Sequence, residues 1–224
     1  MKKIAYLCYC VFFLAFITQL WYAMSDALTF STNGKIAIVF LQIAMMILGS
    51  VANAKTLTKQ QKKKDIRFTQ IILFFLFLGN LTYLLFFDRD FGRTNSHIGY
   101  SLSEYIQSNV NVIPFSTIRL YINGYHLGIV TYEMVMINVV GNIIAFMPFA
   151  YFFPLFFKSQ RNVFVFFISM LTIISSVEVL QVLMQSGSGD VDDLILNMLG
   201  VISLYLIFKL PFISTLIYGD DIGG

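Results

Sequence analysis

Three sets of polar side chains interrupt apolar stretches of the sequence. They are, in chain order, Asn138 and Asn142; then Ser175, Glu178, Gln181 and Gln185; then the acidic trio Asp190, Asp192 and Asp193, followed by Asn197. Within a set, most neighbours are three or four positions apart, and residues at that spacing share one face of an α-helix. Each set therefore predicts a polar stripe on an otherwise apolar helix.

Carboxyl and amide groups inside a membrane are costly and usually face the interior of a helix bundle or a wet cavity. If the three stripes meet, they form a polar, acidic pocket that could bind a ligand. In an enzyme, Glu178 would be a general base, and Asp190 with Asp193 would hold a divalent cation through oxygen ligands. In a small transporter, Glu178 would be a proton-linked site. The alternative is that the stripes only join helices by hydrogen bonds, but such a bond needs no ionisable Glu178.

Several features favour a binding protein over an enzyme or a transporter. The sequence has no nucleophile–base pair, no phosphate-binding glycine loop and no Cys/His metal spacing, and we detect no internal repeat of the kind common in transporters. Cys8 and Cys10 are two residues apart, so they lie on different helix faces and suit neither a disulfide nor a metal site. We therefore expect no cofactor and no resident metal.

The elements that position these residues are transmembrane helices. The 224-residue chain is 58% hydrophobic and 12% charged, whereas a soluble domain carries roughly 25% charge. Apolar surface in this proportion needs lipid to cover it. Six apolar runs cover residues 4–24, 36–52, 68–87, 134–157, 162–185 and 194–210. The prediction is an all-α, polytopic transmembrane helix bundle of about six helices, with residues 1–87 forming the first three and residues 88–224 the rest.

The basic residues predict the orientation. If the N-terminus lies in the cytoplasm, eleven of the fifteen Lys and Arg residues are cytoplasmic, as the positive-inside rule favours. Both termini then lie inside, and residues 55–67 form a basic cytoplasmic loop. That loop is explained by contact with anionic membrane lipid, so we expect no nucleic-acid partner.

This topology places the three stripes at similar depth. The fourth helix enters from outside, the fifth ends there, and the sixth enters from there again. At 1.5 Å per residue, Asn142 lies about 12 Å, Glu178 about 10 Å and Asn197 about 5 Å below the outer ends of their helices. The three stripes thus occupy the outer half of the membrane, and the expected pocket opens outward.

The long segment 88–133 on the outer side is interrupted by Pro114. Proline disfavours a helical residue before it, so Asn111 to Ile113 should be extended, and a short helix should start near Phe115. We expect this segment to be re-entrant or interfacial and to pack over the pocket, because irregular backbone at membrane depth needs protein or water around it. His97 and His126, also in this segment, are interpreted as surface residues.

Five motifs together resemble those of the VanZ-like membrane proteins, a family named for a protein associated with glycopeptide (teicoplanin) resistance in Gram-positive bacteria. They are NVIPFSTI at 111–118, NVVGN at 138–142, FMP at 146–148, EVLQ at 178–181 and DVDDLILN at 190–197. The resemblance implies cell-envelope biology and an effect on antibiotic susceptibility, without a reaction. One departure is that the family usually has an Arg just before the acidic trio, where this chain has Ser186 to Gly189; Arg119 could supply that charge.

The sequence therefore predicts a multi-pass cell-membrane protein that binds a lipid-linked or peptide-like ligand, such as a cell-wall precursor or a glycopeptide, in an outward-facing pocket. The alternatives are a metal-assisted enzyme acting on a lipid-linked precursor and a proton-linked transporter. The sequence leaves the oligomeric state open. The candidate pocket residues are Asn111, Pro114, Phe115, Asn138, Asn142, Glu178, Gln181, Asp190, Asp193 and Asn197.

Overall fold

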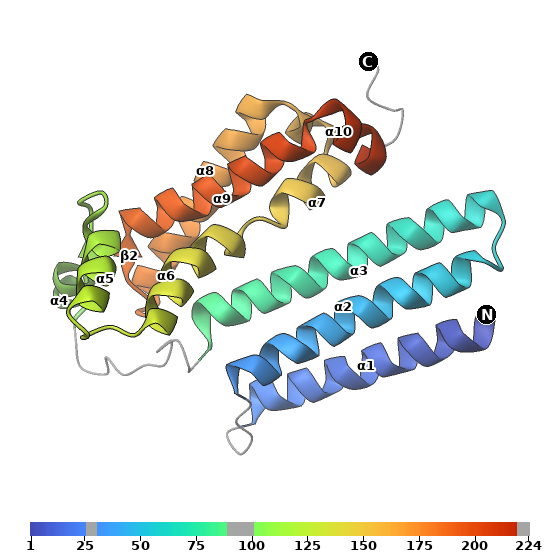
Figure 1. Ribbon diagram of the computed structural model, residues 1–224, viewed down its shortest axis with the longest axis horizontal. Helices are drawn as coiled ribbons and strands as arrows, with labels where there is room; N and C mark the ends of the chain where they lie inside the picture. The colour runs from blue at the N-terminus through green and yellow to red at the C-terminus, as the bar shows by residue number, and fades with distance from the viewer. Residues whose placement is uncertain (26–30, 89–100, 219–224) are drawn as a thin grey trace. The chain divides into compact units, whose positions relative to one another are not determined.

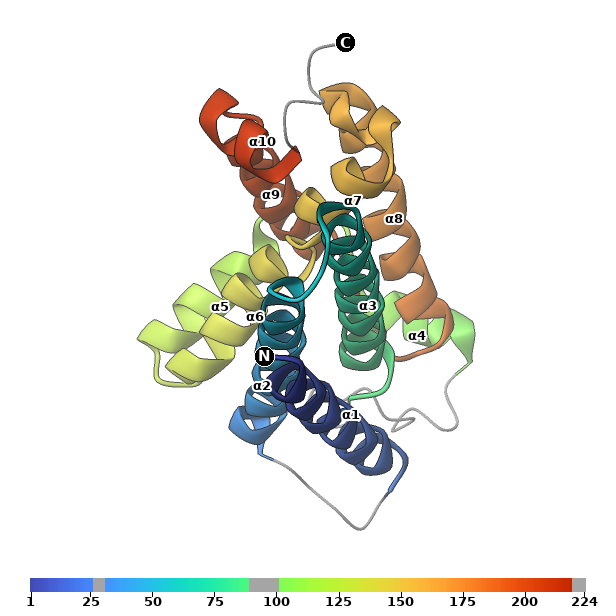
Figure 2. The same ribbon diagram turned by 90° about the vertical axis from the view of Figure 1, so that its right-hand side faces the viewer.

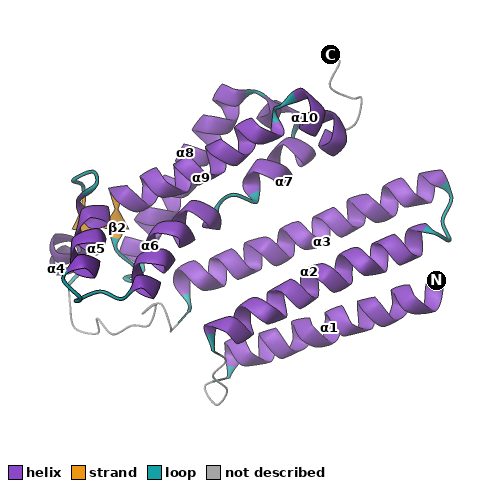
Figure 3. Ribbon diagram, in the orientation of Figure 1, coloured by secondary structure: helices purple, strands orange, loops and turns teal. Residues whose placement is uncertain are grey.

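The computed structural model describes residues 1–25, 31–88 and 101–218 (Figure 1). Six of its helices are long and apolar enough to cross a membrane, which confirms the predicted multi-pass helical protein. The spans are Lys2–Met24, Thr32–Ala54, Lys59–Phe86, Tyr132–Phe156, Val163–Leu183 and Val191–Phe208. Figure 3 shows that nearly all of the described chain is helical. The two strands that the described residues form have two residues each.

The chain forms two compact units, Met1–Gly79 and Asn80–Gly224, and the boundary falls within a helix. The first unit contains α1 (Lys2–Met24), α2 (Thr32–Ala54) and most of α3 (Lys59–Phe86). Helices α1 and α2 lie side by side (Figures 1 and 2). The Gln42 Nε2 donates to Gln19 Oε1 at 2.8 Å between them. Phe12, Met46 and Leu76 form the apolar core of this unit.

Helix α3 begins earlier than the hydropathy indicates. The predicted basic loop 55–67 is mostly helix, because Thr58 and Gln61 form a reciprocal cap: the Gln61 N–H donates to Thr58 Oγ1, and the Thr58 N–H donates to Gln61 Oε1. Asp65 then accepts hydrogen bonds from Ser50 and Asn53 of α2. The basic residues from Lys59 to Arg67 therefore lie on helix α3 rather than on a loop, and only Lys55 lies in the turn before it.

The second unit contains the end of α3 and the remaining elements. They are α4 (Leu102–Asn109), β1 (Val110–Asn111), α5 (Ser116–His126), α6 (Tyr132–Ala145), α7 (Phe149–Phe156), the 3₁₀ turn η2 (Lys158–Arg161), α8 (Val163–Leu183), β2 (Gly189–Asp190), α9 (Val191–Phe208) and α10 (Pro211–Tyr218). Its core is built on α9, where Val201 and Tyr205 are buried, and the Tyr205 ring stacks on Phe166 of α8 at 4.0 Å.

The predicted single helix at 134–157 is broken in the structure. Helix α6 ends at Ala145, and α7 begins at Phe149. Pro148 has no N–H, so the Ile144 carbonyl cannot receive its regular helical bond; it accepts from the Met147 N–H instead, at 3.1 Å. Hydropathy did not reveal the break because the residues before Pro148 are themselves apolar.

The last two spans differ from the predicted boundaries for reasons of capping. Helix α9 begins at Val191, three residues before the predicted start, because Asp190 caps it by accepting from the Asp192 N–H at 2.9 Å. Helix α8 ends at Leu183, before the predicted residue 185. Gln185 there adopts a left-handed conformation with φ 51°, and the Ser186 N–H closes the helix end on the Gln181 carbonyl at 2.9 Å.

Candidate functional site

A buried carboxylate joins the start of α9 to the start of α5. Asp192 is fully buried, and its Oδ1 accepts from the Phe115 N–H. Its Oδ2 accepts from the N–H groups of Thr117 at 2.8 Å and Ile118 at 3.0 Å. The first N–H groups of a helix have no partner within it, and a negative charge there is favoured by the helix dipole. Asp192 therefore caps α5 from a distant part of the chain.

A second set of bonds holds the strand before α5. Strand β1 pairs with β2 in parallel, with Asn111 opposite Asp190. The Asn111 Nδ2 donates to Asp190 Oδ1 at 3.2 Å and to the hydroxyls of Ser116 and Thr117. The Asn111 Oδ1 accepts from the Ile113 N–H. We call the contacts that Asp190 and Asp192 make with residues 111–118 the latch. The latch joins the Pro114 segment to β2 and to the start of α9, the last spanning helix.

The chain turns sharply at Pro114. The Ser116 N–H donates to the Ile113 carbonyl at 3.3 Å, and Phe115 has φ 63° and ψ 8°. These angles are those of the third residue of a type II turn, where glycine is usual. The Phe115 side chain is 56% exposed, and those of Val112 and Ile113 are 75% and 66% exposed. The latch thus holds a strained turn whose apolar side chains remain accessible.

Asp193, also in the first turn of α9, faces α6. The Asn142 Nδ2 of α6 donates to Asp193 Oδ1. Burial raises the pKa of the Tyr121 phenol on α5, and the negative charges of Asp193 and Asp190 raise that pKa further. One turn below Asp193, Asn197 is only 3% exposed, and among the described residues its Oδ1 has no hydrogen-bond partner.

The structure brings together only part of the predicted pocket. Glu178 reaches the latch, since its Oε2 accepts from the Asp190 N–H at 3.4 Å. Gln181 instead donates to the Leu85 carbonyl at the end of α3, at 3.1 Å. Asn138 donates to the carbonyl of Met134 in its own helix, at 2.8 Å. These two side chains share the predicted stripes, but their hydrogen bonds go elsewhere.

A comparison with protein families bears on this arrangement. A family model described as VanZ/LLP1 matches residues 74–214. The chain belongs to the VanZ/LLP1 family. The matched region includes the latch and all ten candidate residues. Comparison with curated proteins and with solved structures found no match.

The candidate residues predicted for this VanZ/LLP1 protein did not include Asp192, although Asp192 accepts three of the latch bonds. A signal for it was present: the N-cap residue of α5 is Phe115, which has no side-chain acceptor for capping, so an acceptor must come from elsewhere. Asp192 lies in an acidic trio at a helix start, where one residue suffices as a cap. The two facts together point to a carboxylate that caps another helix.

The charged residues near the VanZ/LLP1 latch include one exposed cation. Arg119 is exposed on α5, and within the part of the chain that the structure describes, no ion pair joins it to the acidic trio. His126 is exposed at the end of α5, as predicted, and His97 lies outside the described residues. Among residues 1–25, 31–88 and 101–218, no three His, Cys, Asp or Glu side chains are grouped so that they could hold a metal ion.

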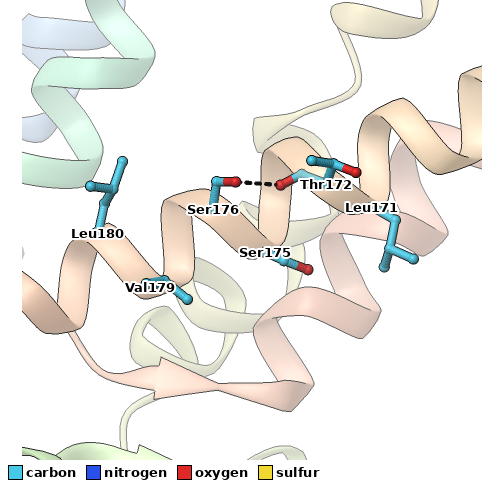
Figure 4. A pocket seen from close by; sticks show the side chains of 6 residues that line it. All are labelled: Leu171, Thr172, Ser175, Ser176, Val179 and Leu180. Atoms are coloured by element: carbon cyan, nitrogen blue, oxygen red, sulfur yellow. Dashed lines mark hydrogen bonds between the residues drawn. The ribbon is translucent and has the colours of Figure 1, made fainter.

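The VanZ/LLP1 fold also has an open hollow along one face of α8, separate from the latch. Its lining residues are Leu171, Thr172, Ser175, Ser176, Val179 and Leu180 (Figure 4). The hydroxyls of Thr172 and Ser176 donate to carbonyls one turn earlier in the same helix. None of the ten candidate residues lines this hollow, so it is not the predicted polar pocket.

Proposed function

We propose that this chain is a non-enzymatic protein of the bacterial cell envelope. It binds a lipid-linked or peptide-like ligand at the end of the bundle that carries the latch, and this binding alters susceptibility to glycopeptide antibiotics such as teicoplanin. The membrane spans and the family membership support the general class. The ligand and the susceptibility effect rest on the resemblance to VanZ-like proteins of Gram-positive bacteria and on the following feature of the site.

The observation that carries the proposal is the form of the latch. Two carboxylates and Asn111 hold one turn in a strained conformation, while Val112, Ile113 and Phe115 keep exposed apolar side chains. Strained backbone persists only where its surroundings fix it, and it is frequent at ligand-binding sites. A fixed apolar surface beside the partly exposed carboxylate of Glu178 suits an amphipathic ligand, such as a lipid-linked precursor with a polar head group.

The test is antibiotic susceptibility in a strain in which deletion of the gene changes the response to teicoplanin. Glu178→Gln keeps the shape of the side chain and removes its charge, so it should abolish complementation while membrane levels and detergent stability stay unchanged. Asn138→Ala, which removes a bond internal to α6, is the matched control and should complement fully. Full complementation by Glu178→Gln would leave a purely structural role for the polar residues.

A second candidate is transport, and the break between α6 and α7 favours it. Many secondary transporters build their sites from discontinuous membrane helices. Counterflow of a labelled solute in proteoliposomes would support this function, and its absence for all solutes tried would leave the binding function. A metal-assisted enzyme would instead show chelator-sensitive turnover of a lipid-linked precursor.

A further inference from the structure

The Asn197 side chain is a buried acceptor that lacks a donor. It is 3% exposed, and its Oδ1 has no hydrogen-bond partner within residues 1–25, 31–88 and 101–218. A buried polar atom without a partner costs about 1–3 kcal/mol, so it is uncommon in a native protein and needs an explanation. Because side chains of an α-helix point toward its N-terminus, the amide of Asn197 extends toward Asp193, four residues earlier.

The neighbouring groups on α6 also present oxygen. Asn142 uses its Nδ2 for the bond to Asp193, so its remaining polar side-chain atom is an oxygen. Gly200 brings the two helices into backbone contact: a Cβ atom added to it would lie 1.8 Å from the Ile143 carbonyl oxygen. Asn142 and Ile143 therefore lie on the part of α6 that contacts the face of α9 bearing Asp193, Asn197 and Gly200.

The break in the spanning helix adds negative potential at the same place. The Met147 N–H, which would be the regular donor to the Ile143 carbonyl, donates to Ile144 instead. The C-terminal end of a helix carries roughly half a negative charge from its unsatisfied carbonyls. Here that end lies within a membrane span, because α6 and α7 together form one apolar span, Tyr132–Phe156.

We propose that Asn142, Asp193 and Asn197, together with the carbonyl end of α6, bind one small monovalent cation between α6 and α9. The groups offer a carboxylate, two amide oxygens and backbone carbonyls, which are the ligands that hard cations prefer. A site with a single carboxylate suits a monovalent ion better than a divalent one. Unwound carbonyls and half-helix C-terminal ends hold cations in other membrane proteins. The cation is an alkali-metal ion or a primary ammonium group, whose N–H would supply the donor that Asn197 lacks.

The test is thermal unfolding of the purified full chain in one detergent at constant ionic strength. Chlorides of sodium, potassium and methylammonium are compared with choline chloride, because choline is bulky and has no N–H. The unfolding midpoint should rise saturably with at least one small cation, by about 5 °C or more at a hundred times the dissociation constant. A rise with sodium or potassium identifies an inorganic ion, and a rise with methylammonium alone identifies an ammonium group. Equal midpoints in all four salts would overturn the proposal.

Variants locate the site. Asp193→Asn should abolish the cation-dependent rise. Asn197→Leu removes the unpartnered acceptor, so its unfolding midpoint in choline chloride should be at least as high as that of the wild type. Any cation-dependent rise of that midpoint should require at least tenfold more cation than in the wild type. Asn138→Ala on the same face of α6 is the control and should respond like wild type. A wild-type response in Asn197→Leu would also overturn the proposal. These measurements do not involve the ligand proposed above, so either proposal can fail alone.

Discussion

Asp192 shows how one side chain can organise a distant segment. Its carboxylate is fully buried, and the residues that donate to it lie 74–77 positions earlier in the chain. In Asp192→Asn, an NH₂ group would replace one carboxylate oxygen and face N–H donors. We expect the variant to lose about 3 kcal/mol or more of stability, and amide hydrogen exchange at Thr117 and Ile118 should accelerate.

The control for this prediction is Glu133→Gln. Glu133 is an exposed acidic residue in the first turn of α6, so it interacts with a helix start without being buried. Its replacement should lower the free energy of unfolding by less than about 1 kcal/mol. Hydrogen exchange of the α5 amides should stay unchanged. Unchanged exchange at Thr117 in Asp192→Asn would mean that the latch does not hold α5.

At the residue scale, the sequence predicted which segments meet but not which atoms bond. Asp190, Asn111 and the Pro114 turn were among the predicted residues and all belong to the latch, whereas Asp193 accepts from Asn142 instead. Helical periodicity says that two residues share a face, but it does not say which neighbour that face meets. Gln181 follows Glu178 by one turn, yet it contacts the end of α3. Only the packing of the helices could assign that partner.

At the scale of elements, the contact between α6 and α9 depends on one glycine. An ideal Cβ at Gly200 would come 1.8 Å from the Ile143 carbonyl oxygen, and small residues allow such close backbone approach in membranes. Gly200→Ala should therefore separate the helices and destabilise the protein by about 1–3 kcal/mol. Thermal unfolding in a fixed detergent measures the loss.

The matched control is Gly141→Ala in α6, because a Cβ there meets nothing within 4 Å. Alanine favours a helix more than glycine does, so this change should be neutral or stabilising by up to about 1 kcal/mol. If both variants lower the unfolding midpoint equally, close packing at Gly200 is not the reason for the loss.

The sequence predicted the number of spanning helices well, because length and hydropathy determine it. It predicted their ends less well, since capping bonds set those. The reciprocal Thr58–Gln61 cap and the Asp190 cap each moved a helix start toward the N-terminus. The break before α7 was signalled only by Pro148, within a run whose hydropathy is uniform.

At the scale of the whole molecule, the family match and the structural division nearly coincide. The matched region begins at residue 74, and the second compact unit begins at Asn80. The latch and the proposed cation site both lie in this second unit. The first unit therefore adds spans and a basic helical turn, and the features that distinguish the family are concentrated in the second.

The predicted topology places Lys62 and Gly187 on opposite sides of the membrane, because an odd number of spans separates them. In a variant without Cys8 and Cys10, single cysteines at the two positions should differ in labelling by an impermeant thiol reagent in intact cells. The cysteine at 187 should react, and the one at 62 should react only after permeabilisation. Equal labelling of both in intact cells would be incompatible with six spans.

The latch also has a consequence for biosynthesis. Phe115 precedes its acceptor Asp192 by 77 residues, and chains are made at about 5–20 residues per second, so the α5 start waits about 4–15 s for its cap. Through that interval the first N–H groups of α5 lack the acceptor that the finished protein provides. A chain that terminates before Asp192 would never acquire it. Closure of the latch therefore marks a nascent protein whose last spanning helix has begun to form.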